Sequence, residues 1–190
     1  MLHFCTTTHQ SYYTMRIIRG KYKSRHIPTP TNFTARPTTD FAKEGLFNIL
    51  ENVYIDFDAE PTALDLFAGT GSISLELASR GCRKVVSVEK SYKHWLYLSR
   101  LQKELQAKEW LPLKGDVFRY ASACKEKYDI IFADPPYALE NLKDIPETVL
   151  PLLADDGLFV LEHGSDYDFS SHPRFVEHRN YGSVNFSFFQ

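Results

Sequence analysis

Apolar positions follow two different spacings along the chain. Short apolar runs predict strands at 63–67, 84–89, 110–113, 128–133, 157–162, 174–179 and 184–189. A spacing of three to four residues predicts helices at 41–50, 72–80, 91–108, 117–123 and 142–153. Strands that alternate with helices are typical of βαβ units, so the predicted class is α/β with a mainly parallel sheet.

The composition is that of one folded domain. The chain has 190 residues, of which 43% are hydrophobic and 24% charged. No apolar run approaches the roughly 20 residues that a membrane-spanning helix needs. Residues 1–14 lack the basic start and apolar stretch of a secretory signal, so we expect a cytoplasmic protein that does not bind a membrane.

Neither cysteine nor histidine is spaced like a metal ligand. Cys5, Cys82 and Cys124 are far apart and odd in number, which favours a reducing compartment over a disulfide framework. The histidines show no paired spacing, so no metal site is predicted.

Positive charge is concentrated at the start of the chain. Residues 1–45 carry a net charge of +5, whereas 46–190 carry −7. Between 16 and 27 basic residues alternate with apolar ones, as in a strand that lays cations along phosphates. The candidate RNA-binding residues are Arg16, Arg19, Lys21, Lys23 and Arg25. A solvated edge strand, protected by its cations, explains the pattern equally well.

Chemistry is expected where the parallel strands end, because ligands of open α/β sheets bind at the carboxyl ends of the strands. Gly69 and Gly71 follow the first of these strands and allow a backbone approach to a ligand. Asp65 suits an ammonium group better than a pyrophosphate, and Glu89 at the next strand end can accept both hydroxyls of a ribose. Together they indicate S-adenosylmethionine. The structural alternative is a tight turn with Asp65 as a partnered carboxylate.

The third and fourth strand ends are acidic as well. Asp116 either accepts a hydrogen bond from an adenine amino group or caps the next helix. The fourth strand ends in Asp134-Pro135-Pro136-Tyr137. Asp134 and the Pro135 carbonyl can both accept hydrogen bonds from one exocyclic amine, while Tyr137 stacks on the base that carries it. This predicts alkylation of a base nitrogen, with positioning as the main source of acceleration. A rigid turn with an exposed tyrosine is the structural alternative.

These motifs resemble a known family. The stretches 64–71 and 134–137 look like those of class I S-adenosylmethionine-dependent amino-methyltransferases. The segments 15–23, 36–40 and 43–50 are similar to those of the bacterial RsmD-like family, which methylates guanine N2 in small-subunit (16S) ribosomal RNA. The resemblance runs from Met15 almost to Gln190.

The resemblance implies a Rossmann-like class I methyltransferase fold with a seven-stranded, mainly parallel sheet and a small basic N-terminal extension. It also implies that Arg36, Thr38 and Thr39 belong to the cofactor pocket, to which we add Phe67 and Val117. The expected organisation is a disordered extension at 1–14, an RNA-contacting segment with the first helix at 15–50, and a cofactor-binding core at 51–190. The expected partner is ribosomal RNA within an assembling small subunit, bound by a monomer without an obligate protein partner.

Three other functions fit parts of the pattern. The Asp-Pro-Pro-Tyr stretch would also hold adenine N6 in DNA or RNA, with base flipping for a paired target. Glu89 permits an NAD-dependent oxidoreductase, although the third glycine of the dinucleotide fingerprint is missing. A catalytically silent RNA-binding scaffold is disfavoured because both Asp134 and Tyr137 are present.

Overall fold

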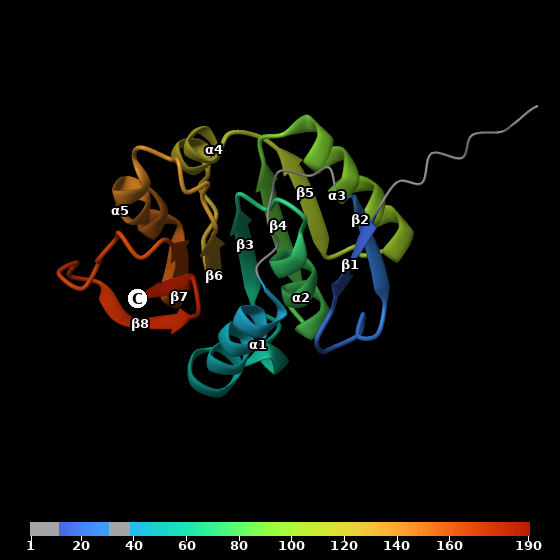
Figure 1. Ribbon diagram of the computed structural model, residues 1–190, viewed down its shortest axis with the longest axis horizontal. Helices are drawn as coiled ribbons and strands as arrows, with labels where there is room; N and C mark the ends of the chain where they lie inside the picture. The colour runs from blue at the N-terminus through green and yellow to red at the C-terminus, as the bar shows by residue number, and fades with distance from the viewer. Residues whose placement is uncertain (1–11, 31–38) are drawn as a thin grey trace, which may run out of the picture.

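A seven-stranded sheet forms the centre of the molecule in the computed structural model, which describes residues 12–30 and 39–190 (Figure 1). The strand order is β5-β4-β3-β6-β7-β9-β8. The strands are β3 (Thr62–Leu66), β4 (Lys84–Glu89), β5 (Trp110–Lys114), β6 (Tyr128–Ala133), β7 (Leu153–His163), β8 (Phe175–Tyr181) and β9 (Val184–Phe189). Strands β3 to β7 pair in parallel, whereas β9 pairs antiparallel with both β7 and β8. The predicted α/β class and the seven-stranded sheet are confirmed.

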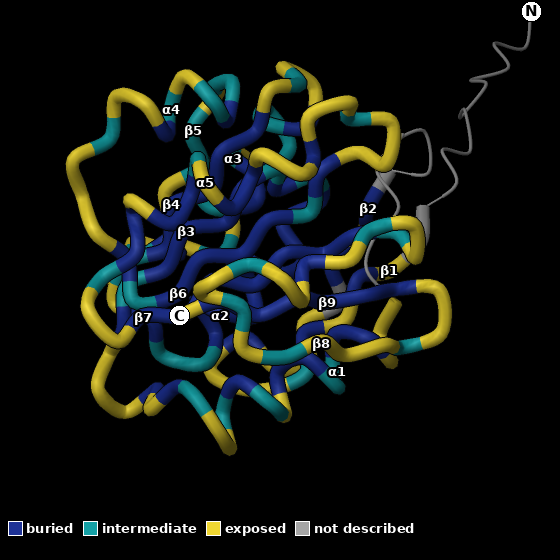
Figure 2. The backbone as a smooth tube through the Cα atoms, turned by 90° about the vertical axis from the view of Figure 1, so that its left-hand side faces the viewer, coloured by how far each residue is buried: buried dark blue, intermediate teal, exposed yellow. Residues whose placement is uncertain are grey.

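Helices cover both faces of the sheet, because the central strands are apolar on both sides. On one face, α1 (Asp40–Ile49), α2 (Ser72–Arg80) and α3 (Tyr92–Leu105) share a core with the sheet. On the other, α4 (Val117–Ala123) and α5 (Ile145–Val149) pack over a second core. Figure 2 shows the central strands as a buried layer between more exposed elements.

The predicted helix at 142–153 is wrong as one continuous helix. The structure has a 3-10 turn at Leu142–Asp144, then α5, then a second 3-10 turn at Leu150–Leu152. Pro146 and Pro151 lie at the starts of the last two elements, where a missing N–H is tolerated. Strand β7 then begins at Leu153, earlier than the predicted 157.

The predicted helix at 91–108 ends earlier than expected. Gln106 adopts a left-handed conformation with φ +53°, and α3 stops at Leu105. The other helices of the core follow the prediction closely, with 72–80 and 117–123 matching α2 and α4.

The N-terminal segment is a hairpin rather than the single strand expected over 16–27. Strand β1 (Tyr12–Arg16) pairs antiparallel with β2 (His26–Pro30). The chain turns between them, with Gly20 at φ +86° and Ser24 at φ +68°. A Cβ on Gly20 would lie 1.8 Å from the Ser79 carbonyl oxygen, so this loop lies directly on α2. Strand β1 begins at residue 12, within the expected 1–14 extension, and residues 1–11 lie outside the described part.

Glu76 on α2 anchors this hairpin loop. Its carboxylate is fully buried and accepts hydrogen bonds from the backbone N–H groups of Ile18 at 2.8 Å and Arg19 at 3.1 Å. Arg80 on the same helix donates to it at 2.8 Å. One turn further along α2, Ser79 accepts from the Tyr22 N–H at 3.0 Å. The hairpin is therefore attached to the sheet through α2.

Candidate active site

The sheet changes direction between β3 and β6. The chain passes outward from β3 to β5 and then returns to β6 on the other side of β3. Ligands bind at such a switch point, outside the carboxyl ends of the strands. Asp65, Glu89, Asp116 and Asp134 all lie at or near the carboxyl end of their strands. The topology therefore brings these predicted residues to one edge of the sheet.

The glycine turn leaves β3 and begins α2. Gly69 and Gly71 have φ values of +52° and +75°, and Gly71 is the residue that caps α2. A Cβ on Gly71 would lie 2.7 Å from Leu98 Cδ2, so a side chain there would be crowded as well as strained. The turn therefore exposes backbone rather than side chains toward the switch point.

Asp65 lies beneath this turn and is 2% exposed. Its Oδ2 accepts hydrogen bonds from the Ser74 N–H at 3.0 Å and from the Ser74 hydroxyl. Burial raises the pKa of Asp65 to about 7, although the hydrogen bonds from Ser74 oppose that shift. Asp65 thus acts as a cap on α2 from β3, which is the structural alternative weighed for it above. Direct contact with a cofactor ammonium group stays a prediction.

Glu89 connects the turn to the end of β4. One of its carboxylate oxygens accepts from the Gly69 N–H at 2.8 Å, and the other accepts from the Ser91 N–H at 2.6 Å. A carboxylate has lone pairs for further donors, so the predicted ribose contact remains compatible with this placement. Glu89 is 8% exposed at this edge.

Asp116 caps α4, as its alternative role required. Its side chain accepts from the N–H groups of Phe118 at 3.1 Å and Arg119 at 3.3 Å. The Lys90 ammonium, 3.1 Å away, lowers the pKa of Asp116. The adenine contact stays a prediction, because capping leaves part of the carboxylate at the surface.

Three of the remaining cofactor candidates lie among the described residues. Phe67 is half-buried with φ +62° and lies edge-on to Phe118, with ring centroids 6.5 Å apart. Val117 is buried in the core under α4. Thr39 caps α1 by accepting from the Ala42 N–H at 3.2 Å. Arg36 and Thr38 lie outside the described residues.

Asp134 follows β6 directly, and its backbone N–H donates to the Leu66 carbonyl of β3 at 3.3 Å. Within the described ranges, no residue donates a hydrogen bond to its carboxylate. Burial raises the pKa of Asp134 well above its usual range, and the charge of Glu162 adds to this effect. Among the described residues, this carboxylate therefore lacks the donors that would make it a purely structural group.

The two prolines hold the exit from β6. Pro135 is buried and Pro136 is exposed. The Pro136 carbonyl accepts from the Leu139 N–H at 2.8 Å, whereas no donor in the described part of the chain reaches the Pro135 carbonyl. Tyr137 is 57% exposed. The two acceptors and the aromatic ring expected from the sequence thus lie together on one short segment.

Sequence reasoning missed the end of β7. Glu162 is 4% exposed and follows Leu161, which is paired in register with Ala133 of β6. Gly164 comes two residues later, and a Cβ there would lie 3.7 Å from the Tyr137 ring. The predicted strand 157–162 already ended in this glutamate, so the strand-end rule could have identified it.

Most of the predicted RNA-binding cations are paired with carboxylates. Arg16 pairs with Glu44 and, at 3.2 Å, with Asp40. Arg19 pairs with Glu51 at 2.6 Å, and Lys21 pairs with Glu109 at 2.7 Å. The guanidinium of Arg25 lies 5.7 Å from the Tyr22 ring centroid, and Lys23 is exposed.

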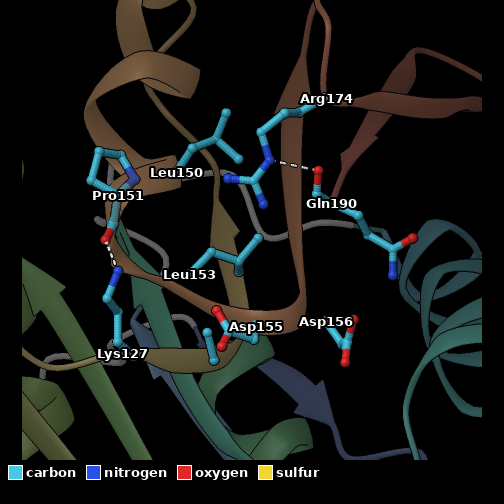
Figure 3. A pocket seen from close by; sticks show the side chains of 9 residues that line it. Lys127, Leu150, Pro151, Leu153, Asp155, Asp156, Arg174 and Gln190 are labelled. Carbon is cyan, nitrogen blue, oxygen red and sulfur yellow. Dashed lines mark hydrogen bonds between the residues drawn. The ribbon is translucent and has the colours of Figure 1, made fainter.

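A hollow at the opposite edge of the sheet does not contribute to this site. It is lined by Lys127 just before β6, by residues between 150 and 156 at the start of β7, and by Arg174 and Gln190 (Figure 3). Lys127 donates to the Pro151 carbonyl and Arg174 donates to the Gln190 carbonyl, each at 2.6 Å. Its two cations are therefore already engaged with backbone oxygens.

Within 12–30 and 39–190, no group of three or more histidine, cysteine or acidic side chains could hold a metal ion. No helix in those ranges combines the length and apolar character needed to cross a bilayer.

Comparisons with known proteins cover nearly the whole chain. The family model described as Conserved hypothetical protein 95 matches residues 15–190. The Bacillus subtilis (strain 168) protein named "Putative rRNA methyltransferase YlbH" is 32% identical over 160 residues, which cover 81% of this chain and 85% of that protein. The Escherichia coli (strain K12) protein named "Ribosomal RNA small subunit methyltransferase D" is 30% identical over 143 residues, which cover 75% of this chain and 68% of that protein.

A solved structure gives the same result for the fold. The structure titled "Putative methyltransferase yhhF from Escherichia coli" superposes with a TM-score of 0.80 at 26% identity, covering 94% of this chain and 98% of that one. The resemblance found in the sequence and the class I methyltransferase fold expected from it are both confirmed.

Proposed function

The chain belongs to the Conserved hypothetical protein 95 family, and we propose that it transfers a methyl group from S-adenosylmethionine to the exocyclic N2 amine of a guanine in small-subunit ribosomal RNA. The chain is a methyltransferase of this family, whose relatives act on ribosomal RNA by name. The guanine, its N2 atom and the residues assigned below are the parts that we propose.

One observation carries the proposal. At the switch point of the sheet, Asp134 is a carboxylate without a hydrogen-bond donor among the described residues, and it is followed by a Pro135 carbonyl in the same condition. Acceptors left unsatisfied at a ligand-binding edge favour a ligand that brings its own donors. An exocyclic amine brings two N–H groups, which matches this pair.

The residues at the neighbouring strand ends fit S-adenosylmethionine. The glycine turn offers backbone without side chains, and Glu89 offers a carboxylate at the end of the adjacent strand for the ribose hydroxyls. Asp116 lies one strand further out, where the adenine would bind. The cofactor supplies an electrophilic methyl group on a positively charged sulfur.

The chain's own residues prepare the amine. Asp134 and the Pro135 carbonyl accept hydrogen bonds from its two N–H groups, which draws the nitrogen toward tetrahedral geometry and frees its lone pair. Tyr137 holds the ring of the base by stacking. Asp134 then accepts the proton that the alkylated nitrogen loses, a role that its raised pKa suits. Positioning supplies much of the acceleration.

Tyr137→Ala is expected to lower kcat/KM for the RNA substrate by about 5- to 150-fold, since stacking of a base on an aromatic ring contributes about 1–3 kcal/mol. Tyr137→Phe keeps the ring, so its kcat/KM should stay within about threefold of the original value. Steady-state methylation kinetics measure both. Equal losses in the two variants would show that the hydroxyl rather than the stacking face matters.

The N-terminal hairpin is proposed to contact RNA through its exposed cations. Exposed ion pairs contribute only about 0–1 kcal/mol, so Arg16 and Arg19 can exchange their carboxylates for phosphates. Lys21 pairs with Glu109, whose side chain is only 14% exposed. Among residues 12–30 and 39–190, no carboxylate pairs with Lys23 or Arg25. These two residues should therefore dominate the RNA contact.

Reversing Lys23 and Arg25 to glutamate is expected to weaken RNA binding and to flatten the slope of log Kd against log salt by about 1.4, because each lost single-strand phosphate contact removes about 0.7. Arg83→Glu with Lys125→Glu is the matched control. Those exposed cations precede β4 and β6, at the edge of the sheet away from the site. A slope that falls equally in both doubles would remove the hairpin's assigned role.

The proposed setting is the cytoplasm, with a monomer acting on the assembling small subunit. The seven-stranded sheet with its helices and the small hairpin offer little surface to read a long sequence, so particle shape would supply part of the specificity. Because particle shape contributes to recognition, we expect partly assembled subunits to be a better substrate than naked RNA.

The test is methylation of unmodified ribosomal RNA with methyl-labelled cofactor, using naked RNA and partly assembled subunits in parallel. Digestion to nucleosides identifies the modified base and atom, and the expected product is N2-methylguanosine from small-subunit RNA. N6-methyladenosine would establish the adenine alternative. Absence of label in every RNA, together with calorimetric binding of NAD alone, would establish the oxidoreductase.

A further inference from the structure

We propose that Glu162 determines the choice of base by accepting the N1–H of guanine while Asp134 accepts from N2. This inference rests on the proposed function and adds to it a specificity-determining residue outside the Asp-Pro-Pro-Tyr segment. It turns the end of β7 into one wall of the base-binding site.

The strand register places the two carboxylates side by side. Strands β6 and β7 run in parallel, and their last described pair is Ala133 with Leu161. Asp134 and Glu162 are the next residues on each strand. Adjacent strands lie about 4.8 Å apart, so the two side chains emerge from neighbouring points of the sheet edge.

Both side chains belong to the same face of the sheet. Side chains alternate along a strand, and Phe132 and Val160, two residues before each carboxylate, share the core on the α1–α3 face. Glu162 also pairs in register with Phe186 of β9, which lies in that core. The two acidic groups therefore face the same space beyond the core.

The electrostatics of these groups agree with the placement from the strand register. The charge of Glu162 raises the pKa of Asp134 in addition to the effect of burial. Asp134 in turn raises the pKa of Asp65, which faces it from β3, and Glu89 of β4 does the same. Several carboxylates thus lie at one edge of the sheet, which favours a ligand that carries N–H donors.

Tyr137 and Gly164 complete the wall. A Cβ added to Gly164 would lie 3.7 Å from Cδ1 and 3.9 Å from Cε1 of the Tyr137 ring, so the ring lies on the side of Gly164 where a side chain would project. The segment that carries Asp134 and the segment that carries Glu162 are therefore also neighbours at Tyr137 and Gly164. A base held by Tyr137 lies within reach of both segments.

Base chemistry then separates guanine from adenine. The edge of guanine next to its exocyclic amine carries a donor, N1–H, beside the two N2 hydrogens. Adenine carries an acceptor, N1, beside its N6 amine. A second carboxylate next to the one that grips the amine therefore matches guanine, whereas with adenine two acceptors would face each other without a hydrogen.

The size of the discrimination follows from the loss of that hydrogen bond. A site built to bond an N–H rejects an analogue that lacks it far more strongly than an apolar pocket rejects a missing methylene, with factors of about 10⁴ in well-desolvated sites. Glu162 is 4% exposed, so the contact would be desolvated.

The probe is 2-aminopurine, which keeps the exocyclic 2-amine but has an N1 acceptor in place of N1–H and lacks O6. The change of the ratio in Glu162→Gln separates the N1 contact from the loss of O6. It is placed in the RNA at the position found by the methyl-labelling assay. The original enzyme is expected to methylate guanine at least 100-fold faster in kcat/KM than 2-aminopurine. In Glu162→Gln, whose amide can donate to N1, this ratio should fall at least tenfold. Glu140→Gln, an exposed carboxylate just after Tyr137, is the matched control and should keep the original ratio.

A pH profile supplies a second reading. Removing the Glu162 charge lowers the pKa of Asp134, so the acidic limb of kcat should move to lower pH in Glu162→Gln. This shift tests whether the two carboxylates are close to each other. A merely structural Glu162 would reduce activity on both bases equally, which overturns the inference.

The two levels of the proposal fail in different ways. Absence of methylated guanine from every RNA contradicts the proposed function itself. Guanine methylation at full rate with an unchanged guanine to 2-aminopurine ratio in Glu162→Gln contradicts only the role of Glu162. If the variant does not fold, the original enzyme decides alone, because equal turnover of guanine and 2-aminopurine excludes an N1–H contact.

Discussion

Asp134→Ala is expected to lower kcat by about 10³-fold while leaving the Kd for S-adenosylmethionine within about threefold. Removing one group that stabilises a transition state or transfers a proton costs about 10²- to 10⁴-fold in rate. Asp134 accepts both a hydrogen bond and the departing proton in the proposed mechanism. We therefore expect the decrease in kcat to lie in the middle of that range. Cofactor affinity should survive, because Glu89 and the glycine turn lie on β4 and β3. Single-turnover methylation and calorimetry measure the two quantities.

Two variants separate the parts of this effect. Asp134→Asn keeps an acceptor oxygen but not the charge, so its loss of kcat should be smaller than that of the alanine variant. Asp129→Ala removes a carboxylate at the opposite end of β6, where Asp129 accepts from Thr62 at 2.7 Å. It should leave kcat per folded molecule unchanged. Loss of cofactor binding in Asp134→Ala, with normal turnover once saturated, would contradict the assigned place of this residue.

Glu76→Ala is expected to lower the free energy of unfolding by about 3–5 kcal/mol, the usual cost of breaking a buried ion pair from one side. The substitution leaves Arg80, whose side chain is 4% exposed, without its buried partner. It also leaves the N–H groups of Ile18 and Arg19 without an acceptor. For a chain of this size the change corresponds to a Tm about 6–20 °C lower.

The matched control is Glu51→Ala, which breaks the other ion pair of Arg80 and the exposed side-chain pair with Arg19, at a carboxylate that is 30% exposed, but leaves the backbone N–H groups of Ile18 and Arg19 bonded to Glu76. Its cost should stay below about 1 kcal/mol. Hydrogen exchange at Ile18 and Arg19 should accelerate in Glu76→Ala but not in Glu51→Ala. An unchanged Tm in Glu76→Ala would mean that the hairpin does not depend on this anchor.

The strands and most helices could be predicted because local pattern and tertiary structure agree. Parallel strands such as β6 are buried on both faces and therefore consist of apolar runs in the sequence. Helices α2 and α4 begin at residues that are typical of helix starts, Gly71 and Asp116. Since parallel strands end at one edge, the strand-end rule also placed Glu89, Asp116 and Asp134 together. The family resemblance added the fold and the cofactor.

Other features depend on contacts that no local pattern contains. The alternation over 16–27 resembled a strand, but close contact with α2 at Gly20 makes it a hairpin loop. The carboxylates that pair with Arg16, Arg19 and Lys21 lie 24 to 88 residues away in the chain. Asp65 shows the same limit, because its burial and its bond to Ser74 depend on how α2 packs over β3.

The most direct measurement is a crystal structure of the chain with S-adenosylhomocysteine and a guanosine-containing RNA fragment. We expect guanine N2 within hydrogen-bonding distance, about 2.6–3.2 Å, of both the Asp134 carboxylate and the Pro135 carbonyl oxygen. The cofactor sulfur should face the lone pair of N2, on the side away from these two acceptors. An Asp134 side chain turned away from the base and closed in an ion pair would contradict it.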